Sequence, residues 1–279
     1  MLIATNELAG RRHDPKVAIF DCRHDLTDHA KGLAAYRGGH IPGAHFAPVE
    51  TALAGAKTGR NGRHPLPRPE DFAGFLHAHG VTPETLVVAY DDAGGLYAAR
   101  LWWMARWIGH ERAALLDGGL PKWIAEGRPL ATATLAARPA PAPLPVRAAA
   151  FATVSTDTIQ SSLGGGELLV LDARMANRYR GETEPIDPVA GHIPGAANRF
   201  YKANLEADGT FRAPETLRRE FAALLGGRAP AQVVHQCGSG ITACANLFAM
   251  ELAGLTGSRL YAGSWSEWVS DPSRPVERG

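Results

Sequence analysis

The chain has 279 residues, 45% of them hydrophobic, and a formal net charge of +1 from 29 basic and 28 acidic side chains. This length suits two ordinary domains, each able to bury a core. The near-balance of charge argues against nucleic-acid binding and against binding to an anionic membrane surface, and no run of about 20 apolar residues is present to span a bilayer.

The N-terminus and the cysteines bear on location and cofactors. The first residues, MLIATNELAGRRHD, lack the basic start, apolar stretch and cleavage site of a secretory signal, so we expect mature sequence and a cytoplasmic protein. Cys22, Cys237 and Cys244 are an odd and sparse set, which fits a reducing compartment rather than a disulfide scaffold. No CxxC and no His/Cys cluster with zinc spacing occurs, so we expect neither a metal nor an organic cofactor.

The first half of the chain alternates β-branched stretches with helical patterns. We expect a strand at 17–23 (VAIFDCR), a GHIPGA segment at 39–44, a helix at 69–80, a strand at 86–92 (LVVAYDD) and a Gly/Trp element at 118–123. Strand–helix alternation predicts a mostly parallel sheet with helices on both faces.

Residues 131–150 interrupt this pattern with nine alanines and four prolines. Because proline lacks an N–H and disfavours helix in the residue before it, we predict an extended linker here.

The second half repeats the first. A strand at 168–174 (LLVLDAR), GHIPGA at 191–196, a helix at 214–227, a strand at 232–238 (QVVHQCG) and a Gly/Trp element at 263–268 return in the same order. Two copies of this size indicate duplicated domains rather than a solenoid, which needs at least ~3 short repeats.

We therefore predict two tandem α/β domains, at 1–130 and 151–279, joined by the linker at 131–150. In parallel sheets flanked by helices, ligands bind beyond the carboxyl ends of the strands. Cys237 is predicted at such an end, followed by a helix over 242–254.

The loop from Cys237 to Thr242 (CGSGIT) suits a reactive thiol. The first turn of a helix offers unsatisfied N–H groups and a partial positive charge, and glycines let several N–H groups converge on one point. Such surroundings favour the thiolate, which is the nucleophile. A buried structural cysteine is the alternative, since free cysteine is among the most buried residue types.

Comparing this loop with the cysteine phosphatase motif and with the equivalent loop of the first half restricts the chemistry that it can perform. Cysteine phosphatases follow His-Cys by five residues and an arginine, whereas Gln236 precedes Cys237 here and Ala243 takes the arginine's place. In the first half, alignment on the paired valines puts Asp91 at the position of Cys237. A carboxylate cannot carry sulfur as a persulfide, so we expect the first domain to be non-catalytic.

The paired GHIPGA segments, the aspartate loop in the first half and CGSGIT in the second resemble the tandem-domain rhodanese superfamily, over about residues 17–268. The resemblance implies sulfur transfer in two steps. The Cys237 thiolate takes sulfur from a small donor and becomes a persulfide. An acceptor then removes the outer sulfur: cyanide, a small thiol, or a protein thiol such as thioredoxin. Backbone N–H groups of Gly238, Gly240, Ile241 and Thr242 would hold the persulfide.

The donor is harder to assign. The CGSGIT loop resembles those of 3-mercaptopyruvate sulfurtransferases, while thiosulfate-preferring relatives usually carry basic residues after the cysteine. The resemblance assigns the donor's anionic group to Arg178, with Arg180 as a weaker candidate. The second arginine usual in mercaptopyruvate-type relatives is absent. The nearest register gives Asp187, and we expect an acid there to repel a carboxylate donor.

The resemblance also implies a proton relay of Ser239 and His64, the latter in a His-x-Leu-Pro setting supplied by the first domain. Desulfurating mercaptopyruvate leaves an enolate that needs a proton. We predict 3-mercaptopyruvate as the donor ahead of thiosulfate. The alternative is a persulfide carrier with little activity on small donors.

Several other residues are interpreted as structural. His40 and His192 are duplicated in the GHIPGA turns, and Asp21 and Asp172 are duplicated at strand ends where they would accept backbone N–H bonds. Cys244 is assigned to the core and Cys22 is interpreted as structural. Trp265 either packs in the core or lines an active-site cleft, which we expect between the two domains. Three tryptophans of the first domain are assigned to the core or the domain interface: Trp102, Trp103 and Trp107.

Overall fold

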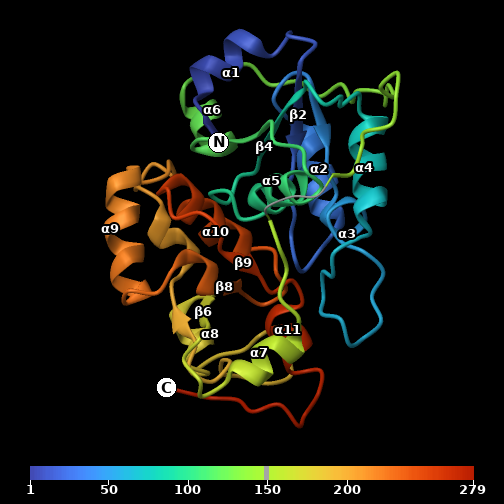
Figure 1. The fold of residues 1–279 in the computed structure, drawn as a ribbon. Helices are drawn as coiled ribbons and strands as arrows, with labels where there is room; N and C mark the ends of the chain where they lie inside the picture. The colour runs from blue at the N-terminus through green and yellow to red at the C-terminus, as the bar shows by residue number, and fades with distance from the viewer. Residues whose placement is uncertain (148–150) are drawn as a thin grey trace. The chain divides into compact units, whose positions relative to one another are not determined.

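The computed structural model describes residues 1–147 and 151–279, and its contacts divide the chain into two compact units (Figure 1). The first unit consists of Met1–Gly55, the residues from Pro67 through the linker, and Leu205–Phe211. The second consists of Ala56–Leu66, Phe151–Asn204 and Arg212–Gly279. The division predicted from the sequence places residues 56–66 in the first domain and 205–211 in the second. In the structure, each of these two segments belongs to the other unit. The last three residues of the predicted linker, 148–150, lie outside the described residues.

The first unit is built on a five-stranded parallel sheet. Its order is β1 (Leu2–Ile3), β5 (Ala113–Leu116), β4 (Leu86–Tyr90), β2 (Val17–Asp21) and β3 (Ala44–Phe46). Its helices are α1 (Thr5–Arg11), α2 (Ala30–Gly38), α3 (Val49–Ala52), α4 (Pro69–Ala78), α5 (Ala98–Trp107) and α6 (Gly119–Ala125).

Both faces of this sheet are covered, as continuous apolar strands require. On one face, Leu8 of α1 and Trp123 of α6 are buried in a cluster with Ile19 and Val88. On the other, Phe20 contacts Phe75 of α4, with ring centroids 5.7 Å apart. Helix α5 packs on β4 and β5 and buries its adjacent tryptophans, Trp102 and Trp103.

The second unit holds a four-stranded parallel sheet in the order β7 (Ala197–Asn198), β6 (Leu169–Asp172), β8 (Val233–Gln236) and β9 (Arg259–Leu260). Its helices are α7 (Thr156–Ser162), α8 (Ala176–Tyr179), α9 (Pro214–Leu225), α10 (Ala243–Leu252) and α11 (Ser264–Trp268), with 3₁₀ turns η1 (Tyr201–Asn204) and η2 (Pro230–Gln232).

The second sheet is covered in the same way as the first. Ile159 of α7 and two tryptophans of α11, Trp265 and Trp268, share a buried cluster with Val170 and Val234. Helix α10 packs against β8 and against α9, the red and orange helices of Figure 1. Trp265 is therefore a core residue; it is fully buried, and its indole N–H donates to the carbonyl of Val189.

The structure confirms the predicted fold class of two parallel α/β sheets flanked by helices. Each predicted strand appears, shortened by two residues at its carboxyl end where the loop begins, and β6 and β8 also begin one residue later than predicted. Among the described residues, no helix combines the length and the apolar character needed to cross a membrane.

The duplication extends to side-chain contacts. Asp21 and Asp172 end equivalent strands, and each accepts the backbone N–H two residues later, as predicted. His40 stacks on Tyr36 and His192 stacks on Tyr179, and each ring Nδ1 lies within 2.8 Å of its tyrosine's carbonyl oxygen. These contacts confirm the two histidines as turn-stabilising residues.

Candidate active site

The Cys237 loop (residues 237–242) connects β8 to α10 through a tight turn. Gly240 has a φ of +78°, and a Cβ at this position would lie 2.1 Å from the carbonyl oxygen of Ala262. Only glycine meets both demands. Cys237 itself is 2% exposed. The sequence therefore places the thiol on a backbone that has little freedom to relax.

The start of α11 holds this loop from the other side. The Cys237 N–H donates to Ser264 Oγ at 3.1 Å, and the same hydroxyl donates to the Tyr261 carbonyl at 2.9 Å. The N–H groups of Trp265 and Ser266 donate to the carbonyls of Cys237 and Gly238. Ser264 has a φ of +54°, the one positive φ outside glycine among the described residues. A strained residue kept in this place indicates that the position of Cys237 is tightly specified.

Backbone N–H groups in this kind of loop point at the central side chain. In the Cys237 loop the Ser239 N–H donates to Cys237 Sγ at 3.5 Å. In the Asp91 loop (residues 91–96) of the first unit, the Asp91 carboxylate accepts four N–H groups at 2.8–2.9 Å, from Ala93, Gly95, Tyr97 and Ala98. The Asp91 loop thus gathers backbone donors around a carboxylate, in the way that the sequence predicts for a sulfur anion in the Cys237 loop.

The other two cysteines are held in structural surroundings. Cys244 is fully buried in α10 and donates to the Gly240 carbonyl one turn earlier. Burial raises the pKa of the Cys22 thiol well above its usual value, and the carboxylates of Asp91 and Asp21 raise it further. These surroundings disfavour the thiolate form of Cys22, which is the nucleophilic form.

A hydrogen bond joins Ser239 to His64. His64 Nδ1 lies 2.7 Å from Ser239 Oγ, and both residues are buried. His64 was expected from the first domain, but its segment, 56–66, belongs to the second unit. The physical reason is that this segment packs against residues 263–266: the Arg63 N–H donates to Ser266 Oγ, and a Cβ on Gly62 would lie 2.7 Å from the Gly263 carbonyl oxygen.

Arg178 lies at the end of α8 and faces the Cys237 loop. Its Nε and Nη2 donate to the Glu184 carboxylate at 3.1 and 2.6 Å, and Nη2 lies 3.3 Å from Asp187 Oδ2. Both terminal nitrogens are 3.7 Å from the position that a Cβ on Gly238 would occupy. The guanidinium is therefore fixed by two carboxylates beside the residue that follows the thiol.

Arg180 has different surroundings. It is exposed, and its guanidinium pairs with the equally exposed Glu182. The remaining predicted residues lie within the loop: the Gly238 carbonyl accepts from α11, Ile241 is buried, and Thr242 immediately precedes α10.

Three residues near the thiol were missed by the sequence reasoning: Ser264, Arg63 and Arg174. Arg174 pairs with Asp172, and its guanidinium carbon lies 4.8 Å from the ring centre of Trp265. Burial acts to lower the Arg174 pKa, but Asp172 and Glu184 raise it above its usual value. Its duplication as Arg23, two residues after Asp21, was the available signal.

The first unit contains a cluster of metal-ligating side chains and a pocket. His24, His29 and Glu50 bring one ligand atom each to within 4.8 Å of one another, the one such metal-ligand grouping found among the described residues. Glu50 Oε1 lies 3.8 and 3.5 Å from the two ring Nε2 atoms, and His29 is exposed. A carboxylate that pairs with two histidines makes the same contacts without a metal ion, so this cluster does not by itself indicate a metal site.

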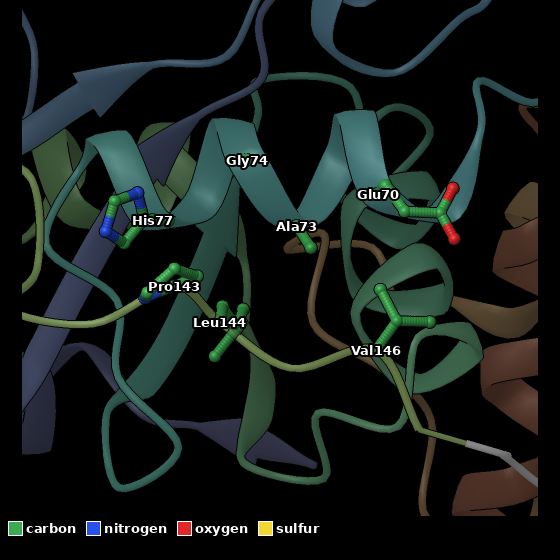
Figure 2. A pocket seen from close by; sticks show the side chains of 7 residues that line it. All are labelled: Glu70, Ala73, Gly74, His77, Pro143, Leu144 and Val146. Carbon is green, nitrogen blue, oxygen red and sulfur yellow. The ribbon is translucent and has the colours of Figure 1, made fainter.

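A pocket of about 320 Å³ lies between α4 and the linker (Figure 2). Pro143, Leu144 and Val146 of the linker face Ala73 and Gly74 of the helix. Its histidine, His77, is used structurally, since Nε2 lies 3.0 Å from the Ala140 carbonyl oxygen. The pocket contains none of the predicted site residues.

Comparison with known proteins places this geometry in a family. A model described as a rhodanese-like domain matches residues 4–126 and again 155–271. The probable 3-mercaptopyruvate sulfurtransferase of Pseudomonas aeruginosa is 47% identical over 280 residues, which cover all of this chain and 98% of that protein. The thiosulfate sulfurtransferase of Azotobacter vinelandii is 33% identical over 280 residues, covering 99% of this chain and 97% of that protein.

Solved structures agree. The 3-mercaptopyruvate sulfurtransferase from Leishmania major superposes with a TM-score of 0.82 at 30% identity, covering 96% of this chain and 74% of that one. The 3-mercaptopyruvate sulfotransferase SseA from Escherichia coli superposes with a TM-score of 0.80 at 29% identity, covering 95% and 98%. The similar proteins bear the names of both donors, so these names do not decide which donor this chain uses.

Proposed function

The chain belongs to the rhodanese family and is a sulfurtransferase, and we propose that it takes sulfur from 3-mercaptopyruvate through a persulfide on Cys237. The thiolate attacks the donor's sulfur, forming an S–S bond while the C–S bond breaks. The electron pair of that bond goes to the enolate of pyruvate, which takes up a proton. Two steps thus replace one difficult transfer.

The observation that carries this choice of donor is the hydrogen bond between Ser239 and His64, 2.7 Å long and next to the thiol. The pyruvate enolate must be protonated on carbon, which a positioned hydroxyl–imidazole pair can do. Thiosulfate leaves as sulfite and needs no such proton. A buried relay at this point has a use with 3-mercaptopyruvate and none with thiosulfate.

The loop backbone would stabilise the persulfide. N–H groups of residues 238–242 would surround the outer sulfur, as four N–H groups surround the Asp91 carboxylate in the duplicate loop. Arg178 would bind the donor's carboxylate with the edge of its guanidinium that faces Gly238. The pairing of Arg180 with Glu182 favours a surface role for that residue.

In the second step an acceptor attacks the outer sulfur and the Cys237 thiolate leaves. Cyanide would depart as thiocyanate, and a small or protein thiol, thioredoxin included, would depart as a persulfide. The Ser239–His64 pair has no role as a proton donor in this step, because no carbon is protonated.

The test is to measure kcat/KM for 3-mercaptopyruvate and for thiosulfate on the wild type and on Cys237→Ser, Ser239→Ala and His64→Ala. We expect Cys237→Ser to abolish turnover of both donors. Ser239→Ala and His64→Ala should lower kcat for 3-mercaptopyruvate about 100-fold, the usual contribution of acid–base catalysis, and change thiosulfate turnover only a few-fold. Equal losses on both donors would contradict the relay. Turnover of neither donor by the wild type would favour the persulfide-carrier alternative.

A further inference from the structure

Arg63 lies against the Cys237 loop, although it is distant from it in sequence. Its backbone N–H donates to Ser266 Oγ at 3.0 Å. Its Nη2 is 2.8 Å from the position that a Cβ on Gly238 would occupy, closer than any side chain there would allow. The arginine therefore occupies the space beside the residue that follows the thiol.

Asp187 links this arginine to Arg178. One carboxylate oxygen pairs with Nη1 of Arg63, and the other lies 3.3 Å from Nη2 of Arg178. The Asp187 side chain is 3% exposed, whereas those of Arg178 and Arg63 are 15% and 27% exposed. The carboxylate is thus buried behind two guanidiniums that still reach solvent.

Each guanidinium keeps one unused nitrogen. In the hydrogen bonds found among the described residues, Nη1 of Arg178 and Nη2 of Arg63 take no part. These two nitrogens are 3.7 and 2.8 Å from the same point beside Gly238. Two N–H-bearing groups of positive charge therefore face one place next to the thiol, which is the arrangement that a carboxylate with two oxygens requires.

We propose that Arg63 is the second arginine of the donor site and that, together with Arg178, it binds the donor's carboxylate. This inference rests on the proposed function and names a residue that sets its donor specificity. Asp187 is a positioning residue, because it holds both guanidiniums from behind. The acid that was expected to repel a carboxylate donor is neutralised by the two arginines and serves to orient them.

The close approach of Arg63 also involves position 238, where glycine has a φ outside the left-handed range. Any side chain there would displace the Arg63 guanidinium. The same arrangement explains why the segment 56–66 belongs to the second unit: the Arg63–Asp187 pair and the His64–Ser239 hydrogen bond both attach it there.

Steady-state kinetics provide the first test. Arg63→Ala should raise KM for 3-mercaptopyruvate about tenfold or more, the effect of losing a charge-assisted hydrogen bond, and leave kcat within a few-fold. A carboxylate held equally in the ground and transition states contributes to KM rather than to kcat. Arg60→Ala is the matched control, because Arg60 is an exposed arginine in the same segment. It should leave KM unchanged.

A second test does not depend on sulfur transfer. Iodoacetate carries a carboxylate and iodoacetamide does not, and both alkylate a reactive thiol with loss of iodide. The ratio of their rates at Cys237, located by mass spectrometry, reports anion binding beside the thiol independently of its intrinsic reactivity. Arg63→Ala should lower this ratio about tenfold or more, while Arg60→Ala should leave it as in the wild type.

The outcomes separate the two proposals. An unchanged alkylation ratio and an unchanged KM in Arg63→Ala would overturn the role of Arg63 even if 3-mercaptopyruvate is the donor. A lowered ratio in a protein that turns over neither donor would support the anion site and contradict the proposed function. If Arg63→Ala fails to fold, as judged by its thermal transition, Arg63→Gln carries the test, since it keeps most of the side-chain length and removes the charge.

Discussion

The Asp91 loop and the Cys237 loop follow equivalent strands and are held alike, yet they satisfy their backbones differently. The Leu120 N–H donates to the Asp91 carbonyl as the Trp265 N–H donates to the Cys237 carbonyl. In the first loop, a buried carboxylate accepts four N–H groups. In the second, the Ser239 N–H reaches Cys237 Sγ at 3.5 Å, longer than any of those four bonds.

This difference separates stability from function. An ionised carboxylate surrounded by backbone donors is a strong set of hydrogen bonds and can stabilise a fold. A thiol is a weak acceptor, so the Cys237 loop forgoes that stabilisation, and under the proposed function its donors would stabilise the persulfide instead. The Asp91 loop therefore shows how this turn satisfies its backbone donors when the central side chain is a carboxylate.

Replacing Cys237 by aspartate gives the second loop the central side chain of the first. We expect Cys237→Asp to lose all sulfurtransferase activity, more than about 1,000-fold, because a carboxylate cannot carry sulfur. Relative to Cys237→Ser, it should be more stable by about 1–3 kcal/mol, since a carboxylate gains charge-assisted hydrogen bonds from the loop. Steady-state assays and thermal unfolding check both expectations. A Cys237→Asp protein no more stable than Cys237→Ser would show that the second loop does not direct its N–H groups as the first does.

Asp91→Ala makes the reverse change, removing the acceptor from the first loop. Four buried N–H groups lose their partner, so the free energy of unfolding should fall by about 2–4 kcal/mol. Chemical denaturation measures it. The value of kcat per folded molecule should remain near that of the wild type, because Asp91 belongs to the first unit. Asp91→Asn, which keeps one acceptor oxygen, should lie between the two proteins. Wild-type stability in Asp91→Ala would refute a structural role for this carboxylate.

The two central strands also differ in acid sensitivity. His235 of β8 occupies the position of Ala89 in β4, and burial lowers its pKa to about 3. Between pH 3 and 6.5 the unfolded chain binds a proton at this residue and the folded chain does not. The stabilisation is therefore complete above pH 6.5 and falls with decreasing pH, by about 1.4 kcal/mol per pH unit.

His235→Ala tests this by giving β8 the side chain of β4. The variant loses packing at every pH, so its absolute stability is uninformative. Its unfolding free energy, measured from pH 7 to pH 4, should fall less steeply than that of the wild type by about 1.4 kcal/mol per pH unit. Parallel curves would mean that His235 is protonated in the folded state. His45 of the first unit, whose pKa burial lowers to about 4, remains in both proteins.

The sequence was sufficient for features that depend on local pattern. Parallel strands, the duplicated turns and the Cys237 loop follow from periodicity, glycine placement and repetition, and the structure has them at the predicted positions. The Ser239–His64 contact followed from resemblance, and the structure brings the two side chains together. The residues that this reasoning missed are positioned by contacts between segments that are far apart in the sequence.

Arg63 shows the limit most clearly. It precedes His64, but nothing in the sequence indicates that the segment 56–66 folds with the second unit or that an acid at 187 would bind its guanidinium. Ser264 was hidden for a related reason, because a positive φ at serine is disfavoured and only the hydroxyl's two hydrogen bonds compensate for it. Arg63 and Ser264 are both held by contacts with residues far away in the sequence, and local sequence patterns do not predict such contacts.

The two loops can also be compared at Ser264, where substitutions should have the smallest effects. The first unit has Gly119 at the equivalent position, with a φ of +56°. Ser264→Gly relieves the backbone strain and loses the hydroxyl that accepts the Cys237 N–H, whereas Ser264→Ala loses the hydroxyl and keeps the strain. Ser264→Gly should therefore be the more stable variant by about 1 kcal/mol. Both should lower kcat/KM only a few-fold, because the thiol is held less rigidly, while retaining the donor preference of the wild type.

The reciprocal change, Gly119→Ser, should be the most damaging to stability, since a Cβ there would lie 2.5 Å from the Asp91 carbonyl oxygen. Thermal unfolding of the three variants, with donor kinetics on the first two, orders them. If Ser264→Ala equalled Ser264→Gly in stability, the left-handed conformation would not be costly there, and the hydroxyl alone would account for the serine.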